Sequence, residues 1–405
     1  MHDTKTFIKV QILIATILLG LGFTGGIYVP PLGPTPSVTD IITFADQRLA
    51  AVFPIIQNFK SIITSDPFNI TATWTGGDVC AYRGFYCESP PDNQSATAVA
   101  SIDFNGFRLA APTLDGFLDR LPDLALFHAN SNDFGGAIPS RAASLPYLYE
   151  LDVSNNRLSG PFPEAVLGMS GLVFLDLRFN ALSGAVPPQL FGRAVGLDAL
   201  FINNNLLATR LPDNPGGPTS IVYLTLANNL IFGPIPRSIS RTFSNVSEIL
   251  LLNNLLSGCL PYEIGFLTEA AVIDLGGNRL TGPVPWSVGC LRSLEVLNLA
   301  GNQLYGQVPE VLCWLGKAAN LSLSDNYFTR VGPACWRLVI SGVLDVRRNC
   351  IPGFPAQRSV AECAAFFGRP RFCPYMRMYG HIPCRLPPRY VASASDRPQL
   401  APSPS

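Results

Sequence analysis

Hydrophobic positions recur along the middle of the chain at intervals of 23 to 25 residues. Between residues 99 and 351 the template L-x-x-L-x-L-x-x-N-x-L-x-G-x-I-P returns in successive copies. Its asparagine stands at positions 132, 156, 180, 205, 229, 254, 278, 302, 326 and 349. A fixed period of this length indicates a repeat architecture, in which stacked copies share one continuous core.

Each part of the template predicts a structural role. The L-x-L pair predicts a short strand with two inward leucines and one outward residue between them. Successive strands are expected to stack in parallel, so that each copy buries its leucines against both neighbours. The asparagine is expected to end the strand and to hydrogen-bond backbone groups of the turn. The G-x-I-P segment supplies a permissive turn residue and then a proline that ends regular pairing on the convex side.

The template therefore predicts an α/β leucine-rich-repeat solenoid of about 11 repeats. We expect a right-handed superhelix with a curved parallel β-sheet, and the G-x-[IVFL]-P element is typical of the plant extracellular subtype. Two copies depart from the template. The first carries Phe107 in place of asparagine, and after Leu207 the segment 208–218 predicts an irregular convex side.

The segments outside the repeats predict export and two caps. Lys5 and Lys9 precede an apolar run of about 14 residues, which suits a signal peptide and is short of the roughly 20 needed to span a bilayer. An uncleaved membrane anchor stays open as the alternative. The expected divisions are a signal peptide at 1–26, a Pro-rich linker at 27–43, an N-terminal helical cap at 44–98, leucine-rich repeats at 99–351, a cysteine-rich C-terminal cap at 352–384 and a disordered tail at 385–405.

Composition narrows the function. The 28 basic residues equal the 28 acidic ones, whereas a nucleic-acid-binding protein would show a basic surplus. Ten cysteines in an exported chain imply disulfides. Cys80 and Cys87 are expected to pair in the N-terminal cap, and Cys290 and Cys313 hold nearly the same phase in adjacent copies, about the right distance for a bridge. Glycosylation sequons stand at Asn69, Asn93, Asn245 and Asn320.

Signatures of catalysis are missing from the sequence. The chain has three histidines, no glycine-rich phosphate loop, no H-E-x-x-H and no cysteine spacing that suits zinc. Asp152 and Asp176 occupy outward strand positions of consecutive copies, so a glycosidase-like pair of carboxylates is an alternative. Because L-D-L is a routine form of this repeat, we expect no enzyme, no cofactor and no metal site.

The outward strand positions predict a binding face. Early copies present carboxylates and middle copies present large apolar side chains, an arrangement that suits a basic peptide through burial and charge steering. The alternative is that a glycan or neighbouring loops cover these positions. The predicted ligand-binding residues are Glu150, Asp152, Phe174, Asp176, Phe201, Tyr223, Leu250 and Leu252.

Three segments have a distinctive sequence: Phe59-Lys60 with Ser65-Asp66-Pro67, the run from Ile249 to Pro261, and the tail from Arg347 to Gly353 with Gln357-Arg358-Ser359. Together they resemble the plant leucine-rich repeat extensin family. The likeness covers roughly residues 44–373. It implies Cys313 paired with Cys335, leaving Cys259 with Cys290. Cys350 and Cys363 are also expected in disulfides. The family's long Ser-(Pro)n repeats are missing, so the likeness does not extend to covalent wall anchoring.

The resemblance implies secretion to the cell wall and binding of small cysteine-bearing peptide hormones, the rapid alkalinisation factors. The leading hypothesis is thus a non-catalytic scaffold for small basic secreted peptides in cell-wall growth control. One alternative is an inhibitor of wall-degrading enzymes, similar to polygalacturonase inhibitors. Another is a purely structural wall glycoprotein. Further partners to consider are other wall proteins, wall polysaccharide and a second copy of the chain.

Overall fold

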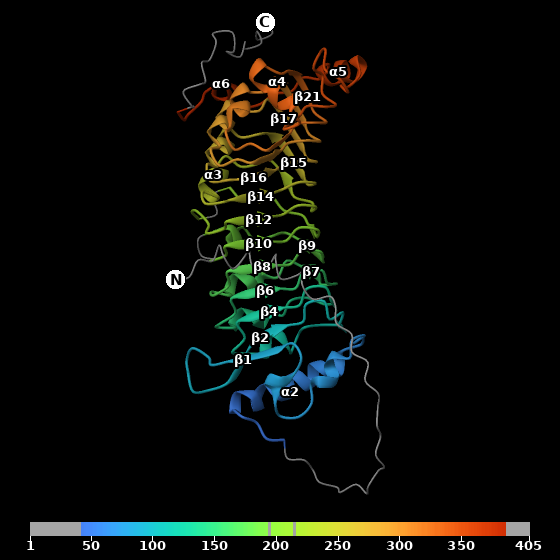
Figure 1. The fold of residues 1–405 in the computed structure, drawn as a ribbon, viewed down its shortest axis with the longest axis vertical. Helices are drawn as coiled ribbons and strands as arrows, with labels where there is room; N and C mark the ends of the chain where they lie inside the picture. Colours follow the sequence, from blue (N-terminus) through green and yellow to red (C-terminus); the bar gives the residue numbers. More distant parts are fainter. Residues whose placement is uncertain (1–41, 193–195, 214–215, 386–405) are drawn as a thin grey trace. The chain divides into compact units, whose positions relative to one another are not determined.

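Short parallel strands line the inner side of the repeat unit (Figure 1). The computed structural model describes residues 42–192, 196–213 and 216–385, and the chain from Thr43 onward is one unit. Its main sheet has twelve strands, and after an antiparallel β1–β2 pair every neighbour runs parallel and in chain order. The strands are β1 (Phe85–Glu88), β2 (Ala98–Asp103), β4 (Leu126–His128), β6 (Glu150–Asp152), β8 (Phe174–Asp176), β10 (Ala199–Phe201), β12 (Tyr223–Thr225), β14 (Glu248–Leu250), β16 (Val272–Asp274), β18 (Val296–Asn298), β20 (Asn320–Ser322) and β22 (Leu344–Asp345).

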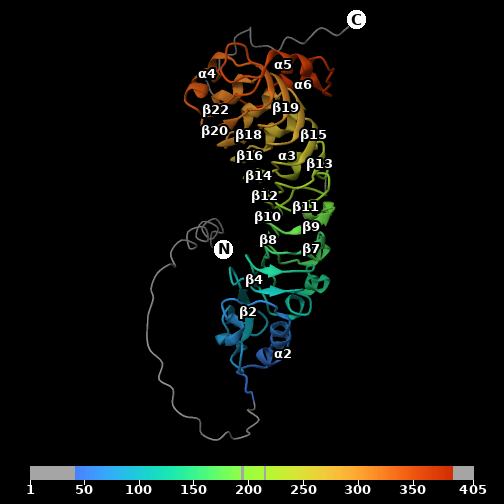
Figure 2. The ribbon, with the colours of Figure 1, turned by 90° about the vertical axis from the view of Figure 1, so that its right-hand side faces the viewer.

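The inward leucines of the template form one continuous core. In β6, Leu151 and the following Val153 are buried, and the equivalent positions of the next copy, Leu175 and Leu177, are buried too. Since each copy covers only its neighbours, the core extends along the whole stack instead of closing. The sheet lies on the inner side of the curve (Figure 2), which makes its outward residues the concave face. These observations confirm the predicted leucine-rich-repeat solenoid.

Short outer strands precede the template proline; they were not predicted, and they form three further sheets. The residues just after each template asparagine form these strands, which stop before the proline begins the convex turn. Among the described residues they are β3 (Ala110–Ala111), β5 (Asp133–Phe134), β7 (Ser159–Pro161), β9 (Ala181–Gly184), β11 (Leu206–Leu207), β13 (Phe232–Gly233), β15 (Leu255–Cys259), β17 (Arg279–Gly282), β19 (Gln303–Gln307) and β21 (Tyr327–Arg330). Strand pairing is interrupted between β5 and β7 and again between β11 and β13, and the second break follows Leu207.

Short helical turns form the convex side, where each copy has too few residues for a long helix. Most are 3-10 turns, and several begin directly after the template proline, as at Pro163 and Pro285. The turns are η3 (Leu118–Arg120), η4 (Ser140–Ser144), η5 (Glu164–Gly168), η6 (Pro188–Phe191), η7 (Tyr262–Phe266), η8 (Trp286–Cys290) and η9 (Glu310–Trp314), with helices α3 (Ile239–Thr242) and α4 (Pro333–Ile340).

The N-terminal cap is built around helix α2 (Gln47–Ile62). The carboxylate of Asp46 begins the helix by accepting a hydrogen bond from the Arg48 amide. Its buried face covers the first repeat, where the Phe59 ring stacks on Phe117 at 3.9 Å between centroids. Two 3-10 turns, η1 (Ile70–Thr73) and η2 (Val79–Ala81), complete the cap, and a disulfide joins Cys80 to Cys87 as the sequence predicts.

The template asparagines form a ladder of hydrogen bonds through the stack. Asn254 donates to the Leu226 carbonyl of the preceding copy and accepts from the Ile231 amide. It also donates to Leu251 and Leu252 in its own turn. The same pattern recurs from Asn132 to Asn349, so the asparagines do satisfy the backbone groups that the turn leaves unpaired.

Gln357 ends this ladder at the C-terminus. Its amide donates to the Val346 carbonyl and accepts from the Ile351 amide. Val346 precedes Asn349 by three residues, and Ile351 follows it by two. In the earlier copies the next template asparagine bonds the groups at these same two positions, as Asn254 bonds Leu226 and Ile231 around Asn229. The segment Gln357-Arg358-Ser359 thus replaces one more repeat, and it explains physically why the C-terminal motif has this form.

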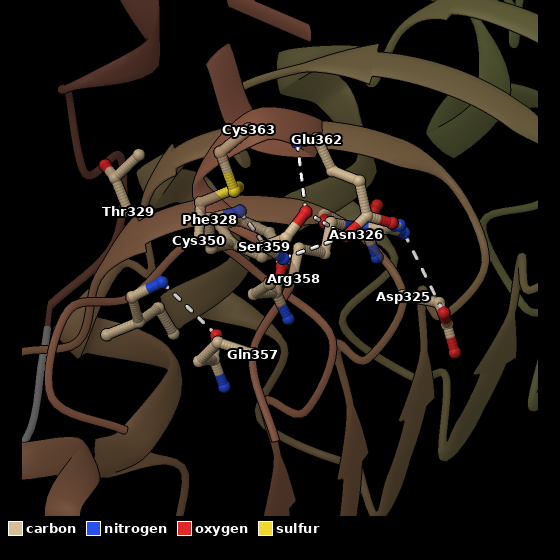
Figure 3. Close-up of a disulfide and its surroundings, with 12 residues drawn as sticks. Asp325, Asn326, Phe328, Thr329, Cys350, Gln357, Arg358, Ser359, Glu362 and Cys363 are labelled. Carbon is tan, nitrogen blue, oxygen red and sulfur yellow. Dashed lines mark hydrogen bonds and ion pairs between the residues drawn. A yellow bond between two sulfur atoms is a disulfide. The ribbon is translucent and has the colours of Figure 1, made fainter. Parts of the chain in front are cut away.

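Helix α5 (Val360–Phe367) covers the last repeats beside this motif (Figure 3). A disulfide joins Cys350 to Cys363 at its base, and Ser359 and Glu362 form a capping box that begins the helix. The Arg358 guanidinium lies over the Tyr327 ring at 4.5 Å and donates to a backbone carbonyl of the preceding repeat. These contacts close the C-terminal end of the core.

Two disulfides differ from the predicted pairing. Cys313 pairs with Cys335, as the family resemblance implies. The pairing of Cys259 with Cys290 is wrong, and so is the alternative of Cys290 with Cys313. Instead Cys259 bonds Cys373 and Cys290 bonds Cys384, two cysteines that were left out of the predicted disulfide set.

The reason is that the tail turns back along the outer side of the earlier repeats. Helix α6 (Met376–Tyr379) lies there, and the Tyr379 hydroxyl donates to the Leu260 carbonyl. Gly282 makes room for the tail: a Cβ at this position would approach the Cys373 sulfur to 2.2 Å. No spacing in the sequence reveals that path.

The predicted segments at the two ends of the chain lie outside the described residues. The signal peptide, the linker up to residue 41 and the tail from 386 belong to residues of which nothing is described. Over 42–192, 196–213 and 216–385, no helix combines the length and apolar character that crossing a membrane requires.

Candidate functional site

The eight predicted ligand-binding residues lie on neighbouring strands of the concave face. In the parallel register Glu150 stands opposite Phe174, and Asp152 opposite Asp176, which in turn stands opposite Phe201. Tyr223 and Leu250 follow on the next two strands, and Leu252 lies just beyond the end of β14. The sheet therefore brings all eight together across β6 to β14, and we call them the central surface.

Aromatic and aliphatic groups dominate the middle of the central surface. The Phe174 and Phe201 rings meet edge to face with centroids 5.6 Å apart. Tyr223, Leu250 and Leu252 are half-buried, so each leaves part of an apolar side chain open to solvent. Soluble proteins rarely expose large contiguous apolar patches, so an apolar patch on a sheet surface indicates a site of interaction.

Asp176 does not lie open on this face, contrary to the prediction. Its side chain has 0% exposure, because the Arg178 guanidinium folds over it with an Nη2–Oδ2 distance of 2.6 Å. Arg178 also lies 5.0 Å from the centre of the Phe201 ring. Burial raises the pKa of Asp176 to about 6; the Arg178 hydrogen bond opposes this shift, and the Asp152 charge adds to it.

The other two early carboxylates are also engaged within the protein. Glu150 Oε2 lies 2.9 Å from Nε2 of His128 on the preceding strand. Burial opposes protonation of His128, but the hydrogen bond to Glu150 and the nearby carboxylates outweigh it and raise its pKa. Asp152 accepts hydrogen bonds from the amide and hydroxyl of Ser154. Glu150 and Asp176 are thus paired with His128 and Arg178, whereas Asp152 is hydrogen-bonded within its own turn.

Glu248 is a further carboxylate of this face and was not among the predicted ligand-binding residues. It stands opposite Tyr223 on one side and Val272 on the other, in the strand position that Glu150 occupies earlier. Among the described residues, its side chain has no hydrogen bond or ion pair, and it is half-exposed. The signal was available, because the same outward position of every copy can be read directly from the template.

Phe179 adds an exposed aromatic ring at the rim of the central surface. The residue before each template asparagine has a left-handed backbone, with asparagine or glycine in most copies. Phe179 takes this conformation with φ 52° and is 52% exposed. A bulky residue in this region costs of order 1–3 kcal/mol and persists where the surrounding fold determines it, often at functional sites.

The alternative of a catalytic carboxylate pair does not fit this geometry. Asp152 and Asp176 stand opposite one another in the register, but Asp176 is covered by Arg178 and fully buried. Hydrolysis by a pair of carboxyl groups requires that both of them reach the substrate bond that is cleaved. No group of His, Cys, Asp and Glu among the described residues has an arrangement suited to a metal ion.

The four sequon asparagines are all exposed, and their glycosylation stays a prediction. Asn69 and Asn93 lie in the N-terminal cap, and Asn245 lies in the turn before β14. Asn320 is the first residue of β20, on the concave face itself.

Comparisons with known proteins agree with the fold and with the repeat sequence. Residues 146–207 and 293–315 match leucine rich repeat families. Leucine-rich repeat extensin-like protein 1 of Arabidopsis thaliana is 42% identical over 123 residues, which are 30% of this chain and 16% of that protein. Leucine-rich repeat extensin-like protein 4 of the same plant is 44% identical over 113 residues, 28% of this chain and 23% of that protein. The matched region therefore spans less than a quarter of either relative.

Two solved structures resemble the repeat unit. A plant peptide hormone receptor, RGFR1 in complex with RGF2, gives a TM-score of 0.54 at 27% identity, covering 58% of this chain and 37% of the receptor chain. A TDR receptor gives 0.53 at 29% identity, covering 59% and 41%.

Proposed function

We propose that this leucine-rich repeat protein, related to the extensin-like family, is a non-catalytic scaffold secreted to the cell wall. Its ligands are small, basic, cysteine-bearing signalling peptides of the rapid alkalinisation factor class, and its role is in growth control. Kinship with extensin-like proteins supports the location, and five disulfides suit an oxidising compartment. The similar hormone receptor is itself in complex with a peptide, RGF2.

The observation that carries the proposal is the apolar centre of the concave face. Phe174 and Phe201 pack edge to face, and Tyr223 and Leu250 continue the patch across the next strands. Aromatic anchors in such a patch supply most of the binding energy at protein interfaces. A peptide laid along the face would bury these side chains while its backbone bonds outward polar groups.

The carboxylate charge on the central surface favours a basic peptide. The open carboxylate beside the apolar centre is Glu248, whereas Glu150 and Asp176 are held by His128 and Arg178. A Lys or Arg side chain of the ligand that packs against Tyr223 would bring its cation to Glu248. Such complementarity gives specificity and a faster association more than raw affinity.

Binding of a synthetic, oxidised rapid alkalinisation factor peptide by calorimetry tests the proposal. The full secreted chain should bind it in the micromolar range or tighter, and the fully reduced, alkylated peptide serves as control. A pull-down from wall extract distinguishes the alternatives, since recovery of a wall-degrading enzyme instead of a peptide would favour an inhibitor. Failure to recover any specific protein would favour a structural glycoprotein, and absence of peptide binding would overturn the proposal.

A further inference from the structure

The concave face changes character after β14. On β16 and β18 the outward residues are Val272, Asp274, Val296 and Asn298, with no aromatic ring among them. The next strand, β20, begins with the exposed Asn320 of the sequon Asn320-Leu321-Ser322. We propose that Asn320 carries an N-linked glycan that lies across β16 and β18 and closes this part of the concave face to protein ligands.

The strand geometry presents the sequon to solvent. Leu321 is fully buried in the core, so the side chains of Asn320 and Ser322 on either side of it face outward together. The chain leading into the strand is open as well, since Lys317 and Ala319 are exposed. A glycan attached to Asn320 would therefore start from an exposed position at the edge of the concave face.

The register defines where the glycan would lie. Asn320 stands opposite Val296, which stands opposite Val272. Paired strands lie about 5 Å apart, so the two valines are about 5 and 10 Å away, within reach of the first sugar residues. None of the other three sequons is in a strand of this sheet: Asn69 and Asn93 are in the cap, and Asn245 is in a turn.

The side chains under that path suit a sugar. Val296 and Val272 are half-buried and offer aliphatic surface to the apolar faces of the pyranose rings, which removes apolar area from water. Asn298 Oδ1 accepts a hydrogen bond from the Ala300 amide, while Asn298 Nδ2 makes no hydrogen bond with another described residue. That amide group is a donor for a sugar hydroxyl.

Occupancy is measured first. The full chain, secreted from plant cells, is treated with a peptide N-glycosidase that accepts plant core glycans, in ¹⁸O-labelled water. Peptide mass spectrometry should then show the labelled conversion of Asn320 to aspartate in most molecules, and none in the Ser322→Ala variant. The Ser322→Thr variant keeps the sequon and should keep the label. An unmodified Asn320 in the secreted protein overturns the proposal.

Coverage is measured second, by hydroxyl-radical footprinting. Enzymatic removal of the glycan should raise oxidation of Val296 and Val272 at least twofold, with Leu250 unchanged as the internal control. Because the enzyme acts on folded wild-type protein, the result does not depend on a variant that folds. Equal oxidation before and after removal overturns coverage. Neither measurement uses a peptide ligand, so the glycan proposal stands or fails independently of the proposed function.

Discussion

The two halves of the concave face share one backbone and differ in what they present to solvent. From β6 to β14 the outward positions hold carboxylates, aromatic rings and leucines, whereas from β16 to β20 they hold valine, asparagine, aspartate and serine. Both halves have the same buried leucines and the same asparagine ladder. The template therefore builds the scaffold, and the residues that it leaves free decide which part of the scaffold binds.

Removing an aromatic anchor is the most direct test of the difference between the two regions. Phe201→Ala should weaken peptide binding about thirtyfold or more, because truncating a buried hot-spot aromatic costs about 2 kcal/mol or more. Val296→Ala, in the other half, should leave the dissociation constant within about twofold. Calorimetric titration of both variants measures this. Equal loss for the two would mean that the site extends over both halves.

A second prediction concerns what the halves share. Asn254→Ala and Asn302→Ala should each lower the free energy of unfolding by about 1–3 kcal/mol, since both leave buried backbone groups unpaired. Asn253 has a left-handed backbone with φ 53°, so glycine is the matched control at this exposed neighbour. Asn253→Gly should cost much less. Chemical denaturation of the three variants tests the ladder, and an equal cost at Asn253 would contradict it.

A third prediction uses the buried carboxyl of the first half. Because the folded pKa of Asp176 is raised to about 6, the folded state binds the proton more tightly than the unfolded state. Stability contributed by this group is therefore present at low pH and lost as pH rises from about 4 through 6. In the Asp176→Asn variant, the free energy of unfolding should fall by about 1 kcal/mol less, or by a still smaller amount, over this pH range than in the wild type.

The measurement is the melting temperature of wild type and variant between pH 4.5 and 7.5. The pKa of His128 is raised above its ordinary value, so His128→Gln is measured beside it to separate the two groups. Asp274, on β16, serves as the control from the other half through Asp274→Asn. Identical pH profiles for wild type and Asp176→Asn would show that this burial has no energetic consequence.

The smallest expected effects concern surface charge. Glu248→Gln should weaken binding about threefold, which corresponds to about 0.7 kcal/mol, the scale of one charge contact near the surface. Reversing Asp152 with Asp152→Lys should mainly slow association and flatten its dependence on salt. Stopped-flow association rates at two ionic strengths separate the two. If Glu150→Gln weakens binding more than Glu248→Gln, the charge assignment is wrong.

Local signals in the sequence were sufficient for the scaffold and for the strand positions of the residues that we propose to bind a ligand. The period of the template determines the strands, the inward leucines and the asparagine ladder, since each depends only on a copy and its neighbours. The same register places Glu150, Phe174, Phe201, Tyr223 and Leu250 on one face. Short-range disulfides such as Cys80–Cys87 also follow from spacing.

Only the tertiary structure decided features that depend on where distant or flexible parts of the chain lie. The tail turns back to bond Cys259 and Cys290, a path of about a hundred residues that no repeat spacing encodes. The outer sheets form because stacking brings weak strand segments into register. Asp176 is buried because Arg178 folds over it, a rotamer choice among packed neighbours. In each case the sequence supplies the groups, and the free energy of packing between copies selects which of them meet.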